Sequence, residues 1–170
     1  MTGVLLVGGA STRFGSPKAL AELDGETLAQ RAWRTLGEAC DERLAVGKTA
    51  DGLELPFEVI DDGTDVRAPI AGVVAGLRAA RQDVCVFLPV DCPLVSAGSL
   101  RMLAAAAPAH PHTGPLPGAY TRAQLPRLQH KLASGDYSLR DVEATVLELD
   151  DRELSNVNTS ADLDAVRRTT

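Results

Sequence analysis

A loop that begins at Gly8 carries residue types suited to binding a triphosphate. The four branched apolar residues 4–7 come directly before it and predict a buried parallel strand. Gly8 and Gly9 let the backbone turn sharply, so that amide hydrogens can face an anion. Arg13 and Lys18 add two full positive charges to the same loop. We therefore expect this loop to hold phosphates through its backbone and these two cations.

This loop matches neither of the two common phosphate-binding signatures. Gly9 and Gly15 have five residues between them, and Lys18 follows Gly15 by three, so the P-loop spacing fails. The Gly-x-Gly-x-x-Gly dinucleotide pattern fails as well. A single Lys or Arg is most often a solvated surface cation. The position of this small-residue loop, directly after a buried strand, favours the functional interpretation.

Asp91 is the best candidate for holding a divalent cation. It follows the apolar run 84–90, so its carboxylate is presented at the end of a predicted strand. Magnesium is usually bound by one or two carboxylates together with phosphate oxygens and water. A turn or cap before Pro93 would suit the same residues, and both interpretations stay open. Asp61 and Asp62 form a weaker pair, because Asp-Asp-Gly is also an ordinary turn sequence.

Two further segments lie just before predicted helices. Gly72, at the end of a Pro-Ile-Ala-Gly segment that begins at Pro69, would allow close approach of the backbone to a base or ribose. Proline is equally ordinary in a first helical turn. Asn156 and Asn158 could donate to phosphate or bind a metal, although Asn is also common before helices for backbone reasons.

The expected elements alternate between strands and helices. Apolar spacing predicts strands at 4–7, 44–46, 57–60, 84–90 and 145–149, and helices at 28–40, 70–77, 99–107 and 123–132. Thr159 with Asp162 predicts a capped start of the last helix. The proline-rich stretch 108–117 is predicted to be a loop. Alternation of this kind indicates an α/β fold, with a mostly parallel, twisted, Rossmann-like sheet and helices on both faces. Such sheets bind ligands at the carboxyl ends of their strands, where the first loop, the turn of Asp61 and Asp62, and Asp91 should converge.

Composition excludes several functional classes. A chain of 170 residues fits one domain, so we expect a single domain over 1–170. The net charge of −6 argues against a nucleic-acid surface. Three cysteines without a Cys-x-x-Cys pair indicate neither a disulfide framework nor a zinc ribbon, and a reducing cytoplasm is the simplest setting. No apolar run approaches membrane-spanning length, so no membrane partner is expected.

Three conspicuous side chains have ordinary explanations. His110 and His112 lie in the proline-rich stretch without a nearby cysteine or further carboxylate to complete a zinc site, and we interpret them as part of a mobile surface loop. Trp33 lies on the apolar face of the first predicted helix, which makes it a core residue in this interpretation.

At these positions the chain resembles the molybdenum cofactor guanylyltransferase family of nucleotidyltransferases. The family's opening motif, Leu-x-Gly-Gly-x-Ser-x-Arg-x-Gly-x-x-Lys, is matched by Leu6, Gly8, Gly9, Ser11, Arg13, Gly15 and Lys18. Three more segments match in the family's order: Pro-Ile-Ala-Gly at 69–72, Asp-Cys-Pro-Leu at 91–94 and Asn-Val-Asn-Thr at 156–159. Four motifs in order over nearly the whole chain are a specific signal.

The resemblance implies transfer of GMP from GTP to molybdenum-bearing molybdopterin, with release of pyrophosphate and with Mg²⁺ as cofactor. It implies catalytic roles for Arg13, Lys18 and Asp91, and metal binding by Asp91. Nucleotide contacts are implied for Leu6, Gly8, Gly9, Lys18, Asp62, Pro69, Gly72 and Asp91, and contacts with the metal or second substrate for Asn156 and Asn158. In this family the Gly-Gly pair and the 69–72 segment line the base pocket, and Gly-Gly goes with guanine. Transient contacts with other cofactor-synthesis proteins or with molybdoenzymes are compatible with this function.

Three alternatives stay open. Two are enzymes on the same scaffold: cytidylyl transfer to the same pterin, or nucleotidyl transfer to a sugar or alcohol phosphate. The third is a nucleotide-binding relative without turnover. It is motivated by two departures from the family pattern: Pro17 stands where many relatives have Asp, and the stretch 104–117 is shorter and richer in proline than the family's strand and loop.

Overall fold

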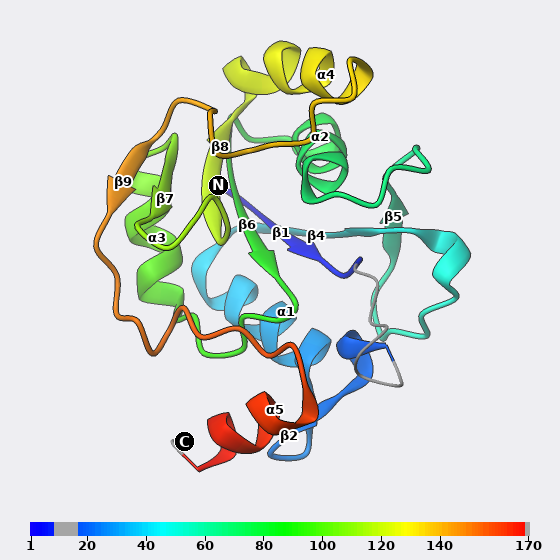
Figure 1. The fold of residues 1–170 in the computed structure, drawn as a ribbon, viewed down its shortest axis with the longest axis vertical. Coiled ribbons are helices and arrows are strands. Elements are labelled where there is room, and N and C mark those ends of the chain that lie inside the picture. Colours follow the sequence, from blue (N-terminus) through cyan, green and yellow to red (C-terminus); the bar gives the residue numbers. More distant parts are fainter. Residues whose placement is uncertain (9–16, 169–170) are drawn as a thin grey trace.

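A computed structural model describes residues 1–8 and 17–168 (Figure 1). The main sheet contains β1 (Thr2–Leu6), β4 (Glu42–Gly47), β5 (Val59–Asp61), β6 (Val84–Pro89), β7 (Ala109–Pro111), β8 (Gly118–Thr121) and β9 (Thr145–Leu147). A small hairpin consists of β2 (Glu22–Leu23) and β3 (Glu26–Thr27). The helices are α1 (Leu28–Ala39), α2 (Pro69–Ala79), α3 (Ala97–Ala105), α4 (Leu125–Ala133) and α5 (Ser160–Arg167), with 3₁₀ turns η1 (Lys18–Leu20), η2 (Thr49–Asp51) and η3 (Arg122–Gln124).

The main sheet is mostly parallel, as predicted. Its strand order is β5-β4-β1-β6-β8-β7-β9. β8 is antiparallel to both of its neighbours, and the other six strands share one direction. The chain first winds outward from β1 through β4 to β5 and then returns to place β6 on the other side of β1. This reversal creates a switch point at the carboxyl ends of β1 and β6, where α/β sheets bind ligands.

Helices cover both faces of the sheet (Figure 1). Successive side chains of a strand point to opposite faces. Val4 and Leu6 of β1 therefore pack in one core cluster with α2 and α4, whereas Leu5 and Val7 pack in the other with α1, α3 and α5. The α/β fold with helices on both faces is confirmed.

Two helix starts follow their sequence signals. Thr27 caps α1 by accepting from the backbone N–H of Gln30 at 3.2 Å. Thr159 caps α5 in the same way, because its hydroxyl accepts from the backbone N–H of Asp162 at 3.1 Å, while the Asp162 carboxylate accepts from the N–H of Thr159. The predicted capping start of the last helix is confirmed.

The prediction of a loop over 108–117 was wrong, because β7 lies inside it. Ala109 is buried and pairs with Ala119 of β8 and Thr145 of β9. Proline removes a backbone donor but keeps its carbonyl, and the Pro108 carbonyl accepts from the N–H of Thr145 at 2.8 Å. His110 therefore lies in a strand and not in the mobile loop that the sequence analysis expected.

Trp33 lies at the margin of the core. Its ring stacks on Phe57 with centroids 4.2 Å apart, and the guanidinium carbon of Arg43 lies 4.7 Å from the ring centroid. It is partly buried and packs against the core cluster on the α1 side. None of the helices in the described part of the chain has the length and apolarity needed to cross a membrane.

Candidate active site

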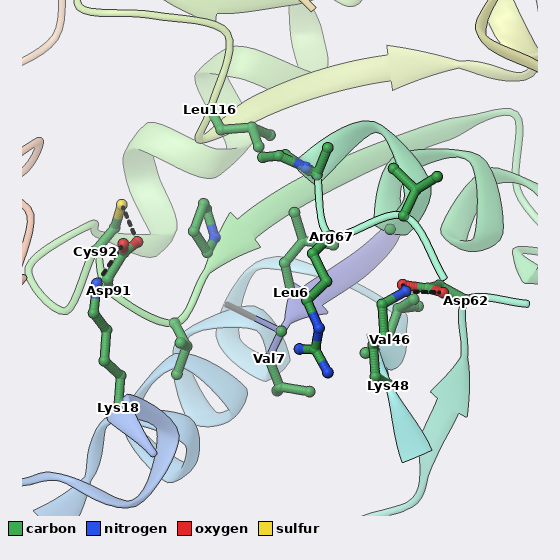
Figure 2. A pocket seen from close by; sticks show the side chains of 18 of the residues that line it. Leu6, Val7, Lys18, Val46, Lys48, Asp62, Arg67, Asp91, Cys92 and Leu116 are labelled. Atoms are coloured by element: carbon green, nitrogen blue, oxygen red, sulfur yellow. Dashed lines mark hydrogen bonds and ion pairs between the residues drawn. The ribbon is translucent and has the colours of Figure 1, made fainter. Parts of the chain in front are cut away.

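A cavity of about 360 Å³ lies at the carboxyl edge of the sheet (Figure 2). It is lined by Leu6, Val7, Gly8, Lys18, Val46, Gly47, Lys48, Asp62, Val66, Arg67, Ala68, Pro69, Gly72, Pro89, Val90, Asp91, Cys92, Leu116 and Asn156. The lining thus comes from the ends of β1, β4 and β6, from the turn after β5, and from the first turn of α2. The predicted convergence of strand ends on one cleft is confirmed.

Backbone hydrogen bonds bring three strand ends together at this edge. The N–H of Val7 donates to the Val46 carbonyl at 3.0 Å, and the N–H of Val90 donates to the Leu6 carbonyl at 3.1 Å. Both bonds extend the ladders of β1 by one step beyond the strand. The residues that follow, Gly8 and Asp91, therefore emerge beside each other from adjacent parallel strands.

Lys18 and Asp91 meet at one end of the cavity. The Nζ of Lys18 lies 3.5 Å from Oδ2 of Asp91 and donates to Oδ1 of Asn158 at 2.6 Å. Both charged side chains are partly exposed, Lys18 by 18% and Asp91 by 26%. Three predicted site residues that lie far apart in the sequence are thus brought within reach of one ligand.

The segment that carries the two asparagines is anchored by the residue between them. Val157 is fully buried, and its N–H donates to the Asp91 carbonyl at 2.8 Å. This bond fixes Asn156 and Asn158 beside the end of β6. Asn156 lines the cavity, and Asn158 reaches Lys18. Both asparagines thus lie beside Asp91, and their contacts with a metal or second substrate stay predictions.

Cys92 is a buried hydrogen-bond donor in this corner. Its thiol donates to Oδ1 of Asn156 at 3.0 Å and lies 3.6 Å from Oδ1 of Asp91. Burial raises the pKa of the Cys92 thiol well above its ordinary value, and the negative charge of Asp91 raises it further. The thiol therefore stays protonated and positions Asn156, without nucleophilic character.

A second ion pair, between Lys48 and Asp62, lies at the other end of the cavity (Figure 2). The Nζ of Lys48 donates to both carboxylate oxygens of Asp62, at 2.7 and 2.8 Å, and also to the Thr64 carbonyl. The two charged side chains are 10% and 8% exposed. Sequence reasoning missed Lys48, although it follows β4 as directly as Val90 and Asp91 follow β6.

The structure separates the two neighbouring carboxylates after β5. Asp61 turns toward η2, where it accepts from the N–H and hydroxyl of Thr49 at 2.9 and 2.7 Å and from the N–H of Gly63 at 2.8 Å. These hydrogen bonds, led by the Thr49 hydroxyl, lower the pKa of Asp61 to about 2. Asp61 thus stabilises the turn, and Asp62 is the carboxylate that lines the cavity.

The first turn of α2 forms one wall of the cavity through Pro69 and Gly72. A Cβ atom added at Gly72 would lie 2.7 Å from Cδ2 of Leu6, so glycine lets the helix pack closely on β1. This packing explains structurally why glycine stands at position 72. The sequence analysis considered only close approach of the backbone to a base or ribose. Gly8 lines the cavity as predicted, whereas Gly9 and Arg13 lie outside the described residues.

Arg67 is a second cavity residue that sequence reasoning missed. It lies in the turn before α2 and forms two hydrogen bonds with Asp51 of η2, at 2.7 and 3.3 Å. Half of its side chain is exposed. Its sequence position could have identified it, because it lies two residues before Pro69, which was already expected at the site.

The donor set fits a divalent ion that binds together with its substrate. Within residues 1–8 and 17–168, no group of three His, Cys, Asp or Glu side chains is placed to hold a metal. Asp91 and the amide oxygens of Asn156 and Asn158 are hard oxygen donors at one end of the cavity. One carboxylate is sufficient for Mg²⁺ when phosphate oxygens and water supply the other ligands.

The parallel sheet, the cleft at its switch point, and the clustered cations and carboxylates define an α/β nucleotidyltransferase. The chain belongs to the MobA-like NTP transferase domain family, whose model matches residues 3–151. A relative from Deinococcus radiodurans, named as a probable molybdenum cofactor guanylyltransferase, is 37% identical over 96% of this chain and 92% of its own length.

Solved structures show the same fold. Molybdopterin-guanine dinucleotide biosynthesis protein A from Archaeoglobus fulgidus superposes with a TM-score of 0.81 at 24% identity, covering 99% of this chain and 98% of that protein. A manganese complex of a Mycobacterium tuberculosis protein superposes with a TM-score of 0.66 at 20% identity, covering 99% and 98% of the two chains.

Proposed function

We propose that this chain transfers the GMP part of GTP to the phosphate of molybdenum-bearing molybdopterin and releases pyrophosphate. The observation that carries the proposal is the cluster of Lys18, Asp91 and Asn158 at the end of β1 and β6, in which Lys18 donates to Asn158 and forms an ion pair with Asp91. The choice of guanylyl group and pterin acceptor is supported by the name of the Deinococcus relative.

The reaction joins two anions. An oxygen of the acceptor phosphate forms a bond to the α-phosphorus of GTP, while the bond from that phosphorus to the bridging oxygen breaks. The electron pair of the broken bond leaves with pyrophosphate. Most of the catalysis must come from positioning the two phosphates and neutralising their charge. In this proposal Lys18 moves from Asp91 onto the triphosphate, and Arg13 adds a second cation from the same loop.

We further propose that Asp91 binds Mg²⁺ and that Asn156 and Asn158 contact the metal or the second substrate. When bound, the ion would neutralise the charge shared between α-phosphate and pyrophosphate. Transfer of the Lys18 ammonium to the triphosphate would leave the Asp91 carboxylate open to this ion. Leu6, Gly8, Gly9, Asp62, Pro69 and Gly72 are proposed to form the rest of the nucleotide site.

The test is pyrophosphate release from each of the four nucleoside triphosphates, with and without molybdopterin that carries molybdate. We expect release that depends on the acceptor, and GTP to be preferred at least about tenfold. A pocket built for guanine leaves polar groups unpaired with another base, which costs about 1 to 3 kcal/mol for each buried group. A preference for CTP would indicate a cytidylyltransferase, and no release from any nucleotide would indicate a binding protein without turnover.

A further inference from the structure

Arg67 differs from the other charged residues that line the cavity. Lys18 is paired with Asp91, and Lys48 is paired with Asp62, so four of the five described lining charges are balanced within the lining. The carboxylate that pairs with Arg67 belongs to Asp51, which does not line the cavity. Arg67 is therefore a described lining cation whose hydrogen-bonded carboxylate lies outside the lining, although Asp62 also attracts it from within the cavity.

The bonds between Arg67 and Asp51 have the geometry that an arginine also uses for a phosphate. Nη2 donates to Oδ1 at 2.7 Å, and Nη1 donates to Oδ2 at 3.3 Å. Two bonds from the two terminal nitrogens to two oxygens of one group form the fork with which guanidinium binds carboxylate or phosphate. In Figure 2 the Arg67 side chain extends into the cavity, between Leu6 and Lys48. The carboxylate of Asp51 thus occupies donors that a phosphate could use.

The pair is also easily exchanged. Arg67 and Asp51 are 51% and 24% exposed, whereas Lys48 and Asp62 are almost buried. Exposed ion pairs contribute little to stability, because water screens the charges and two long side chains must be held in place. Losing Asp51 would therefore cost Arg67 little, and a phosphate carries more negative charge than a carboxylate.

We infer that Arg67 is a substrate-binding residue that exchanges Asp51 for a phosphate group of a ligand in the cavity. Asp51 acts as an internal competitor that holds the guanidinium in place until the ligand arrives. This inference rests on the proposed function for the source of the phosphate, which is the GTP triphosphate or the phosphate of the acceptor. The exchange itself is a binding event and needs no turnover.

The inference is tested by titrating GTP calorimetrically in the absence of acceptor. Arg67→Gln should weaken GTP binding about tenfold, because one charged fork is lost. Asp51→Asn should tighten it about two- to threefold, because the competing charge is removed. The control is Arg34→Gln: Arg34 is equally exposed at 51% and pairs with Glu26 and Glu38, but it does not line the cavity, so its loss should leave affinity unchanged.

The opposite signs of the two variants separate binding from stability. If the pair is purely structural, both variants lower the melting temperature and neither changes affinity, and the inference is overturned. Guanosine, which has no phosphate, should bind all variants equally. Equal losses for guanosine and GTP in Arg67→Gln would assign Arg67 to the base and also overturn it.

Two further measurements identify which phosphate Arg67 binds and separate this inference from the proposed function. If GTP binding is unchanged but the KM for molybdopterin rises in Arg67→Gln and falls in Asp51→Asn, the acceptor supplies the phosphate. Inorganic triphosphate is titrated as a probe without base or acceptor. A wild-type protein that binds it through Arg67 but releases no pyrophosphate from GTP would contradict the proposed function and leave the exchange standing.

Discussion

The two ends of the cavity each hold a lysine–aspartate pair, yet the pairs differ in kind. Lys48 and Asp62 lie 2.7 Å apart and are almost completely buried. Lys18 and Asp91 lie 3.5 Å apart, are more exposed, and share the lysine with Asn158. Both aspartates follow parallel strands at the same edge of the sheet, so local sequence does not distinguish the pairs.

The difference follows from how each ammonium group uses its hydrogens. Lys48 donates to both oxygens of Asp62 and to the Thr64 carbonyl, which matches its three N–H donors. Removing it from this pocket would leave a nearly buried carboxylate without a counter-charge. Lys18 has a longer, more solvated contact with its carboxylate, and a phosphate can replace that contact at low cost. We therefore expect the Lys48–Asp62 pair to stay intact when a ligand binds, and the Lys18–Asp91 pair to be replaced by contacts with the ligand.

The largest effect should come from breaking the buried pair. Lys48→Met keeps the length of the side chain but leaves Asp62 charged and nearly buried. Loss of one partner of a buried ion pair commonly costs several kcal/mol, and we expect about 3 kcal/mol here because some solvent reaches the pair. Urea denaturation of the variant beside the wild-type protein measures this loss.

A second substitution serves as the control for Lys48→Met. Adding Asp62→Asn removes the uncompensated charge while keeping an oxygen that can accept from the N–H of Thr64, which Asp62 binds at 3.2 Å. The double variant should recover most of the lost stability. A Lys48→Met protein as stable as the wild type would show that the pair is no stronger than the exposed one.

The next effect concerns catalysis at the exchangeable pair. Asp91→Asn keeps the shape and turn-forming ability of the side chain but loses the charge that a hard cation needs. We expect a loss of about a hundredfold or more in metal-dependent turnover, equivalent to about 2.7 kcal/mol of transition-state stabilisation. Steady-state rates across a magnesium titration measure it.

Thermal melting of the same Asp91→Asn protein provides the control. Its midpoint should remain near that of the wild type, because the structural bond of Asp91 is made by its backbone carbonyl to Val157. Full turnover at ordinary magnesium concentration would defeat the metal assignment and leave Asp91 as a turn residue.

The fold was predictable because its signals are periodic and local. Apolar runs such as 84–90 and the Thr159 cap predicted elements that the structure contains, with boundaries shifted by one or two residues. The sequence analysis missed β7, where the prolines at 108 and 111 indicated a loop, and it predicted no element at the antiparallel strand β8 or the β2–β3 hairpin. That strand pairs with β9 because the Pro108 carbonyl accepts from the N–H of Thr145 and the N–H of His112 donates to the Leu147 carbonyl. Proline lacks only the N–H, so neither bond is lost.

The site was predictable where a residue belongs to one of the motifs recognised in the sequence. Lys18, Asp91 and the two asparagines were expected and lie together. Lys48 and Arg67 were missed because their contacts depend on tertiary structure: Lys48 meets Asp62 fourteen residues later, and Arg67 meets Asp51 sixteen residues earlier. No local motif encodes an ion pair of this kind.

The smallest effect should come from Lys18→Ala. Lys18 belongs to a partly exposed, exchangeable ion pair, so its removal should change the free energy of unfolding by no more than about 0.5 kcal/mol. In the proposed function its ammonium contacts the triphosphate, and losing one such contact should weaken GTP binding about tenfold, or about 1.4 kcal/mol. Calorimetric titration of GTP beside thermal melting measures both quantities.

Comparing Lys18→Ala with Lys48→Met tests the difference between the two ion pairs, because each variant should lose a different property. Loss of Lys48 should lower stability, whereas loss of Lys18 should lower affinity and leave the melting temperature nearly unchanged. Lys18→Arg keeps the charge and should restore part of the affinity. If the melting temperature of Lys18→Ala is instead as low as that of Lys48→Met, the 3.5 Å contact between Lys18 and Asp91 is structural. The greater exposure of this pair would then not make it exchangeable.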